Sequence, residues 1–200
     1  MKTIIPTKKF NNIIFKLKYM KAISVIASPR KNGNCKQTVD YITQGIEENN
    51  GENKIYFVDD LNIKCCQGCK ACKNLEKPTE CILNDDFNKI MKELRNSDVF
   101  IFAAPNYFGE INAQGHIFIN RFYSMTKTTP NRLKNQPKCI IIHTYGASDG
   151  HYDEYINKRA RVFESIGCKL TEILSIGKNK PSTGNCDELK KHLIKLGKEL

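Results

Sequence analysis

Short apolar segments alternate with helical patterns along most of this chain, and this alternation constrains the fold more than any other feature. Runs rich in Ile, Val and Phe are typical of buried strands, and each is followed by apolar residues at helical spacing. Such alternation predicts an α/β protein with a doubly wound, five-stranded parallel sheet and helices on both faces. Ligands of such sheets bind at the carboxyl ends of the strands. The expected strands cover 22–27, 53–58, 98–103, 138–143 and 168–176, and the expected helices cover 35–49, 85–94, 112–126, 152–163 and 189–196.

The composition is that of a single globular domain and argues against two classes of protein. Of the 200 residues, 40% are hydrophobic and 26% are charged, which is close to the average for globular proteins. We expect no membrane span, because no stretch approaches ~18 consecutive apolar residues. The net charge is +11, but there is no interleaved aromatic and basic stripe, so we expect no nucleic-acid partner. Residues 1–19 hold five lysines and no acid, which predicts a basic N-terminal extension before a domain at 20–200.

The cysteine content indicates a reducing compartment. The nine cysteines are an odd number, and no apolar run near the N-terminus is long enough for a secretory signal. We therefore expect a cytoplasmic protein without a disulfide scaffold. Five of the cysteines lie between Cys65 and Cys81, and in the cytoplasm such a cluster is more often metal-binding or redox-active than structural. Cys139 and Cys168 lie in strand patterns, which predicts that they are buried.

The loop after the first expected strand has the composition of an anion site. Its hydroxyl and amide side chains, the N–H groups of its turn and the N-terminus of the following helix would converge beside basic residues, as suits a phosphate. An ordinary loop between a strand and a helix has a similar composition, so both interpretations stay open. Neither the G-x-G-x-x-G fingerprint nor the P-loop motif occurs. The residues expected at the anion are Ser28, Arg30, Gly33, Asn34 and Cys35.

A second loop, after the third expected strand, is aromatic. Tyr107 and Phe108 could lie against a planar heterocycle, or they could simply cover the end of the sheet. The loop consists of Pro105, Asn106, Tyr107, Phe108 and Gly109.

With these two loops, the chain resembles the flavodoxin-like NAD(P)H-dependent FMN reductases, and more narrowly the iron–sulfur flavoproteins. The matching pieces are Ser28-Pro29-Arg30 with Gly33-Asn34, the 105–109 loop, Ala113-Gln114 leading to Arg121, and the cysteines with the following Asp85-Asp86. The resemblance implies a sheet of strand order 2-1-3-4-5 and a homo-oligomer, either a dimer or a tetramer. It also implies FMN with its phosphate on the 28–35 loop and its ring against 105–109. Thr144 and Gly146, after the fourth strand, would form a third wall around the ring.

The cysteine-rich insert at 65–81 has the spacing Cys66-x2-Cys69-x2-Cys72-x8-Cys81, with Cys65 as an extra neighbour. Three thiolates at three-residue spacing and a fourth from a longer loop could bind a [4Fe-4S] cluster. Zinc is an alternative, although its sites usually have two separated C-x2-C pairs. A dithiol at Cys66 and Cys69, or an inert loop without metal, are further alternatives.

These patterns together predict an FMN-dependent oxidoreductase or electron-transfer flavoprotein with a [4Fe-4S] cluster. The flavin would perform the redox chemistry, so no catalytic side chain is expected, and His143 is expected to be structural. The expected redox partners are a nicotinamide, with NAD(P)H as the electron donor, a quinone-like compound or a ferredoxin. The alternatives are a metal-free NAD(P)H-dependent FMN or quinone reductase and a pure electron carrier between proteins.

Overall fold

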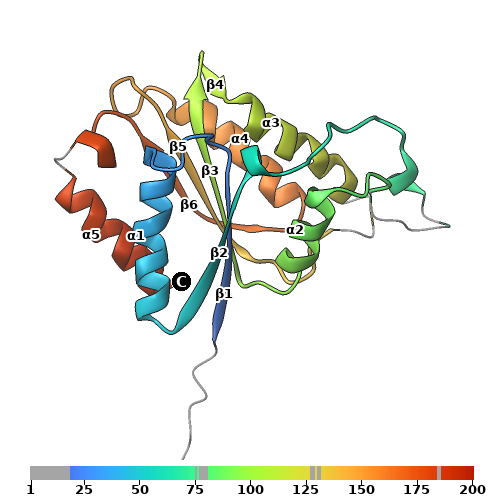
Figure 1. Cartoon of the computed structure of the whole chain (residues 1–200), viewed down its shortest axis with the longest axis horizontal. Helices are drawn as coiled ribbons and strands as arrows, with labels where there is room; N and C mark the ends of the chain where they lie inside the picture. The colour runs from blue at the N-terminus through green and yellow to red at the C-terminus, as the bar shows by residue number, and fades with distance from the viewer. Residues whose placement is uncertain (1–18, 75, 77–80, 127–128, 130–131, 184–185) are drawn as a thin grey trace, which may run out of the picture.

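The computed structural model describes residues 19–74, 76, 81–126, 129, 132–183 and 186–200, and it contains a parallel sheet between two layers of helices (Figure 1). The strand order is β2-β1-β3-β5-β6. This confirms the predicted doubly wound sheet and its order 2-1-3-4-5, counted over the parallel strands. The parallel strands are β1 (Met20–Ile26), β2 (Gly51–Phe57), β3 (Val99–Tyr107), β5 (Lys138–Thr144) and β6 (Lys169–Ile176). The helices are α1 (Asn34–Glu48), α2 (Asp86–Leu94), α3 (Ala113–Asn120), α4 (Asp153–Ser165) and α5 (Asp187–Glu199).

Two details differ from the expectation. A two-residue strand, β4 (Glu110–Ile111), pairs antiparallel with the end of β3, and two residues are too few to give a strand pattern. The helix expected over 112–126 is α3 followed by the 3-10 turn η3 (Arg121–Met125), a common way for an α-helix to end. The other 3-10 turns are η1 (Val58–Asp60), η2 (Ala71–Lys73) and η4 (Pro181–Thr183).

The two faces of the sheet bury different side chains. Helices α1 and α5 cover one face, and α2, α3 and α4 cover the other (Figure 1). The core under α1 and α5 is mostly aliphatic, with Ile26, Ile42 and Ile101 fully buried. The core under the other helices is aromatic, and ring pairs such as Phe102–Phe163 have centroids 5.1 Å apart. The strand side chains alternate between these cores, and this alternation fixes the register of the sheet.

Two glycines allow α1 and α5 to lie in close contact. A Cβ atom on Gly45 would lie 2.0 Å from the carbonyl oxygen of Ile194, and one on Gly197 would lie 2.1 Å from that of Ile42. The helix backbones therefore touch where each lacks a side chain.

Gly45→Ala is expected to destabilise the fold by about 3 kcal/mol, at the upper end of the cost of overpacking, because the added methyl group meets backbone rather than a movable side chain. The free energy of unfolding in urea measures this effect. Gly146→Ala is the matched control, since a Cβ there has no heavy atom within 4 Å and should change stability little. Equal stability of the two variants would contradict the helix contact.

No helix in the described part of the chain is long and apolar enough to cross a membrane. Residues 1–18 of the predicted N-terminal extension lie outside the described residues.

Candidate functional site

The loops at the carboxyl ends of β1, β3 and β5 meet at one end of the sheet. The thiol of Cys35, in the first turn of α1, lies 3.3 Å from the hydroxyl of Thr144, at the end of β5. Thr144 also pairs in register with Pro105 of β3. Asn112 donates its amide to the carbonyl of Ala27 at 2.8 Å, which ties the β4–α3 loop to the end of β1. The structure thus brings the residues predicted from three separate loops to one place.

The 28–35 loop forms a compact turn ahead of α1. The N–H of Arg30 donates to the Ser28 hydroxyl at 3.2 Å, and the N–H of Gly33 donates to the Arg30 carbonyl at 3.2 Å. Gly33 is the N-cap of α1, without a side-chain capping bond, and the first helical turn contains no acidic residue. The first N–H groups of a helix have no partner within the helix. This helix end can therefore accept an anion without competition from a carboxylate of its own.

Cys35 takes part in this site as a neutral thiol. Burial raises the pKa of Cys35 to about 11, and the hydrogen bond to Thr144 and the nearby charge of Arg30 oppose the rise only in part. A protonated thiol does not repel a phosphate, so the cysteine is compatible with an anion at the start of α1.

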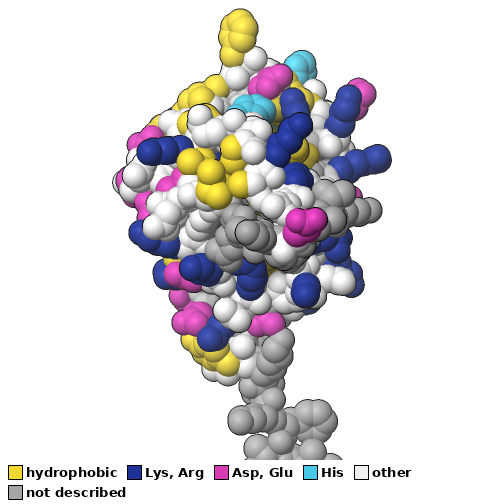
Figure 2. Space-filling model, turned by 90° about the vertical axis from the view of Figure 1, so that its right-hand side faces the viewer, with side chains coloured by type: hydrophobic (Ala, Val, Ile, Leu, Met, Phe, Trp, Pro, Cys, Tyr) yellow, Lys and Arg dark blue, Asp and Glu magenta, His cyan; other side chains and the backbone are white. Residues whose placement is uncertain are grey.

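The aromatic loop is exposed and held in a defined turn. Asn106 accepts a hydrogen bond from the N–H of Gly109 at 3.0 Å, and Phe108 and Gly109 have φ angles of 55° and 91°. Phe108 is fully exposed and Tyr107 is 45% exposed. A hydrophobic side chain stands clear of the surface at the end of the molecule where the β3–β4 hairpin lies (Figure 2). The two rings therefore do not cover the end of the sheet, and they are free to contact a planar ligand.

The third predicted wall is partly open. Thr144 is buried, whereas a Cβ atom added to Gly146 would have no heavy atom within 4 Å. The space beside Gly146 could accept part of a ligand.

His143 lies beneath these loops and is fully buried. Its Nε2 is 3.5 Å from the amide nitrogen of Asn106, and its Nδ1 has no hydrogen-bond partner among the described residues. The rings of Tyr145, Tyr152 and Tyr155 surround it, with centroids 5.5–5.9 Å away. Burial lowers the pKa of His143 to about 4, so the imidazole is neutral at physiological pH.

Stability is expected to fall as the pH drops from ~6.5 to 4, by about 3 kcal/mol in total, because the unfolded chain binds a proton at this histidine that the folded protein does not. Above pH ~6.5 this contribution is constant. Urea unfolding at several pH values measures the slope, which His143→Phe should flatten between pH 6.5 and 5. His192→Phe, at an exposed position, should leave the slope unchanged. An equal slope in wild-type protein and His143→Phe would contradict the assignment.

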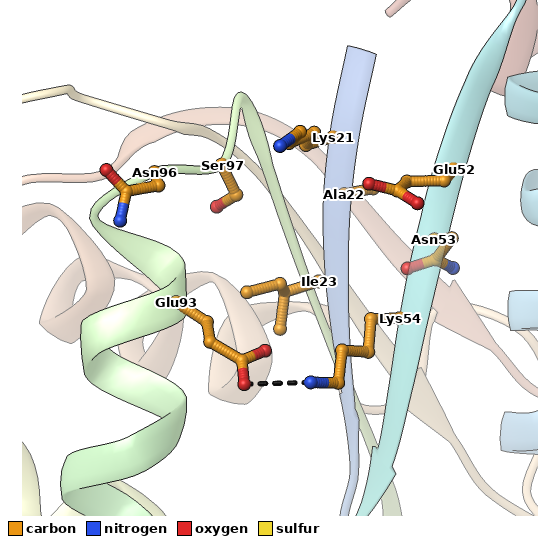
Figure 3. Close-up of a pocket in the computed structure, with 9 residues that line it drawn as sticks. All are labelled: Lys21, Ala22, Ile23, Glu52, Asn53, Lys54, Glu93, Asn96 and Ser97. Atoms are coloured by element: carbon orange, nitrogen blue, oxygen red, sulfur yellow. Dashed lines mark hydrogen bonds and ion pairs between the residues drawn. The ribbon is translucent and has the colours of Figure 1, made fainter. Parts of the chain in front are cut away.

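A separate cavity of about 480 Å³ lies at the amino ends of β1 and β2, the end of the sheet opposite to the candidate site. An ion pair between Lys54 and Glu93, 2.8 Å apart, crosses it (Figure 3). None of the predicted site residues lines this cavity.

The cysteine-rich segment is hydrogen-bonded to α3 near its start and to α2 near its end. The N–H of Cys66 donates to Asn120 at 2.9 Å. The amide of Asn88 donates to the carbonyls of Cys81 and Leu83 at 2.9 and 3.0 Å. In the middle, Lys73 donates to the Thr126 hydroxyl at 2.6 Å.

The four thiols predicted to act as ligands line one small cavity. Cys66, Cys69, Cys72 and Cys81 lie around it together with Arg121, and Cys65 is not among its lining residues. Burial raises the pKa of Cys72, and the neighbouring thiols of Cys81 and Cys66 add to the rise. Among the described residues, no three Cys, His, Asp or Glu side chains are placed to hold a single metal ion.

A buried ion pair lies next to the cysteine-rich segment. Arg121 donates to the carboxylate of Asp85, and both side chains are almost inaccessible to solvent. Arg121 also donates to the carbonyl of Lys64 at 3.0 Å, and the N–H of Lys64 donates to Asp85 at 3.1 Å. Asp85 is the N-cap of α2, but its side chain makes no capping bond, and its Oδ2 accepts instead from Arg121 and from the N–H of Lys64.

The match to a family model decides how the chain is classified. The model of NADPH-dependent FMN reductases matches residues 20–172. The chain belongs to this family. The match covers all three loops at the carboxyl ends of β1, β3 and β5, together with the cysteine-rich segment.

Curated relatives of this chain align with about half of its length. An iron-sulfur flavoprotein of Archaeoglobus fulgidus is 33% identical over 102 residues, which are 51% of this chain and 45% of that protein. An iron-sulfur flavoprotein of Methanocaldococcus jannaschii is 32% identical over 102 residues, which are 51% of each chain. The chain thus matches about half the length of these relatives.

Solved structures show the same fold at low sequence identity. The NAD(P)H:quinone oxidoreductase from Methanothermobacter marburgensis has a TM-score of 0.66 and 14% identity, over 90% of this chain and 96% of that one. An FMN-dependent NADH-azoreductase from Bacillus anthracis, in complex with FMN, has a TM-score of 0.67 and 11% identity, over 90% and 98%.

Sequence reasoning missed several residues that shape the site. Asn112, buried between the ends of β1 and β3, gave no signal beyond its place at the start of the expected 112–126 helix. The N–H of Ser182, from η4 before α5, donates to Asn34 at 2.9 Å and so contacts the 28–35 loop from a segment where no function was predicted. The pairing of Asp85 with Arg121 was not foreseen, although both residues belong to matching motifs.

Proposed function

We propose that this chain is an FMN-dependent oxidoreductase that binds the cofactor at the carboxyl ends of β1, β3 and β5. The observation that carries the proposal is the family match over residues 20–172, together with the meeting of the three predicted loops at one end of the sheet. The uncapped start of α1 and the open space at Gly146 fit a phosphate and a ring of this kind.

Each loop has a distinct part in the proposed site. Ser28, Arg30, Gly33, Asn34 and the start of α1 at Cys35 hold the phosphate, and Thr144 keeps Cys35 in place. Pro105 and Asn106 shape the turn that presents Tyr107, Phe108 and Gly109 to the ring, and Gly146 leaves room opposite. When bound, FMN supplies the redox chemistry, so the protein needs only to bind, orient and shield it.

Arg30→Ala is expected to weaken FMN binding roughly ten- to hundredfold, the loss of about one charge-assisted hydrogen bond of ~1.5–3 kcal/mol. Arg30 lies beside Gly33, with its Nε 3.6 Å from the position of a Cβ atom there, so its charge is near the start of α1. Fluorescence titration of the FMN-free protein measures the affinity.

Lys31→Ala is the matched control for this prediction. The Lys31 ammonium pairs with Asp60 and lies 3.9 Å from the centroid of the Phe57 ring, so it is engaged away from the proposed phosphate. The prediction is contradicted if Arg30→Ala binds FMN within about twofold of the wild-type affinity, where a tenfold change corresponds to ~1.4 kcal/mol. The phosphate would then lie elsewhere.

We further propose that Cys66, Cys69, Cys72 and Cys81 bind a [4Fe-4S] cluster. A cuboidal cluster takes one thiolate at each of four separate irons, so its ligand sulfurs stand further apart than those around one metal ion. The four cysteines around one cavity supply the number of thiolates that such a cluster needs. The cluster would supply single-electron transfer next to the two-electron chemistry of the flavin.

The proposed donor is NAD(P)H and the proposed acceptor a quinone-like compound, with a ferredoxin as an alternative donor. We expect the protein to act as a homo-oligomer in the cytoplasm, where its nine free cysteines would stay reduced. Anaerobic stopped-flow reduction tests the donor. Rapid bleaching of the flavin by NAD(P)H supports the reductase, whereas bleaching only by a reduced ferredoxin supports an electron carrier.

A further inference from the structure

Arg121 is the one charged side chain that lies fully inside the described part of the molecule, and it lines the cavity of the four cysteines. A buried guanidinium is costly unless its donors are satisfied. Its surroundings therefore indicate what the charge is used for.

Most of its donors are engaged away from the thiols. One terminal nitrogen donates to the carbonyl of Lys64 and to Asp85. The other lies 3.4 Å from the Leu83 carbonyl and 3.5 Å from the Asn88 side chain. The Nε–H is buried and has no partner among the described residues.

The opposing carboxylate is also incompletely satisfied. Asp85 uses Oδ2 for Arg121 and for the N–H of Lys64, while its Oδ1 is buried without a partner among the described residues. The arginine thus keeps one donor without a partner among the described residues, and it lines the same cavity as the four cysteines. Sulfur atoms of a cluster and its thiolates accept such hydrogen bonds.

We propose that Arg121 donates its Nε–H to a sulfur of the bound cluster or of its thiolate ligands and thereby raises the reduction potential of the cluster. This inference rests on the proposed cluster. The reduced cluster is more negative than the oxidised one, so a hydrogen-bond donor and positive charge beside it stabilise the reduced form. Asp85 offsets part of that charge and holds the guanidinium in position.

The test is the midpoint potential of the cluster in the anaerobically purified full chain, followed by electron paramagnetic resonance during a redox titration. Arg121→Lys keeps a cation beside Asp85, and hence the fold, but lacks the Nε–H, so the potential should become more negative. Asp85→Asn keeps the acceptor oxygen but removes the opposing charge, so the potential should become more positive. A general loss of order in the cysteine segment would not shift the cluster potentials of the two variants in opposite directions.

Asp86→Asn is the control, because that neighbouring carboxylate bonds to Lys89 and the N–H of Asn62 and should leave the potential unchanged. The inference is overturned if Arg121→Lys and Asp85→Asn both bind iron normally and either keep the wild-type potential or shift it in the same direction. A wild-type protein that holds no iron would overturn the proposed cluster and the inference together.

Discussion

Alanine at any one of Cys66, Cys69, Cys72 or Cys81 is expected to remove most of the iron from the protein and to leave FMN binding intact. Three remaining thiolates would leave one iron of the cluster open to water and oxygen. The proposed flavin loops lie at the ends of β1, β3 and β5, whereas the cysteine segment is hydrogen-bonded to Asn120 of α3, Asn88 of α2 and Thr126 after η3. Iron, sulfide and FMN per chain, measured after purification and reconstitution without oxygen, test this result.

Cys65→Ala is the matched control. Cys65 is exposed and is not among the residues that line the thiol cavity, so this variant should keep nearly all of its iron. Loss of iron in Cys65→Ala equal to that in Cys66→Ala would show that the ligand set is wrong. Stoichiometric FMN without iron in the wild-type protein would leave the metal-free reductase as the function.

Arg121→Leu is expected to destabilise the protein by about 3–5 kcal/mol, because it leaves the Asp85 carboxylate buried without its counter-charge. The variant also loses the hydrogen bond to the Lys64 carbonyl and the cation–π contact with Phe87, whose ring centroid lies 4.7 Å from the guanidinium carbon. Urea unfolding of the metal-free, reduced protein measures the effect without a contribution from bound iron.

The double variant Arg121→Leu with Asp85→Leu should recover much of this loss, since replacing both members of a buried pair by apolar residues is often nearly neutral. Lys89→Ala breaks an exposed ion pair with Asp86 and should change stability little. A single Arg121→Leu variant as stable as Lys89→Ala would show that the pair does not hold the segment in place.

The fold could be predicted because its signals are local in the sequence. Apolar runs and helical periodicity report burial along one element at a time, and their alternation excludes most other topologies. The cysteine spacing and the loops at 28–35 and 105–109 could be located in the same way, since each lies within one short segment. The two-residue strand β4 is too short to carry a pattern, so only the tertiary structure shows it.

Contacts between segments far apart in the sequence could not be predicted in this way. Arg121 and Asp85 are 36 positions apart, and their pairing depends on how α2 and η3 pack, which no local pattern encodes. The same holds for Gly45 beside Gly197 and for Ser182 beside Asn34.

The sequence by itself determined the parallel α/β sheet, the strand ends where we propose the site and the set of cysteines that could act together. Only the tertiary structure decided that His143 is neutral, that the aromatic loop is exposed and that a buried arginine borders the thiols. The physical reason is that periodicity reveals which face of an element is buried. Charge states and partners depend instead on which atoms meet across elements when the chain packs.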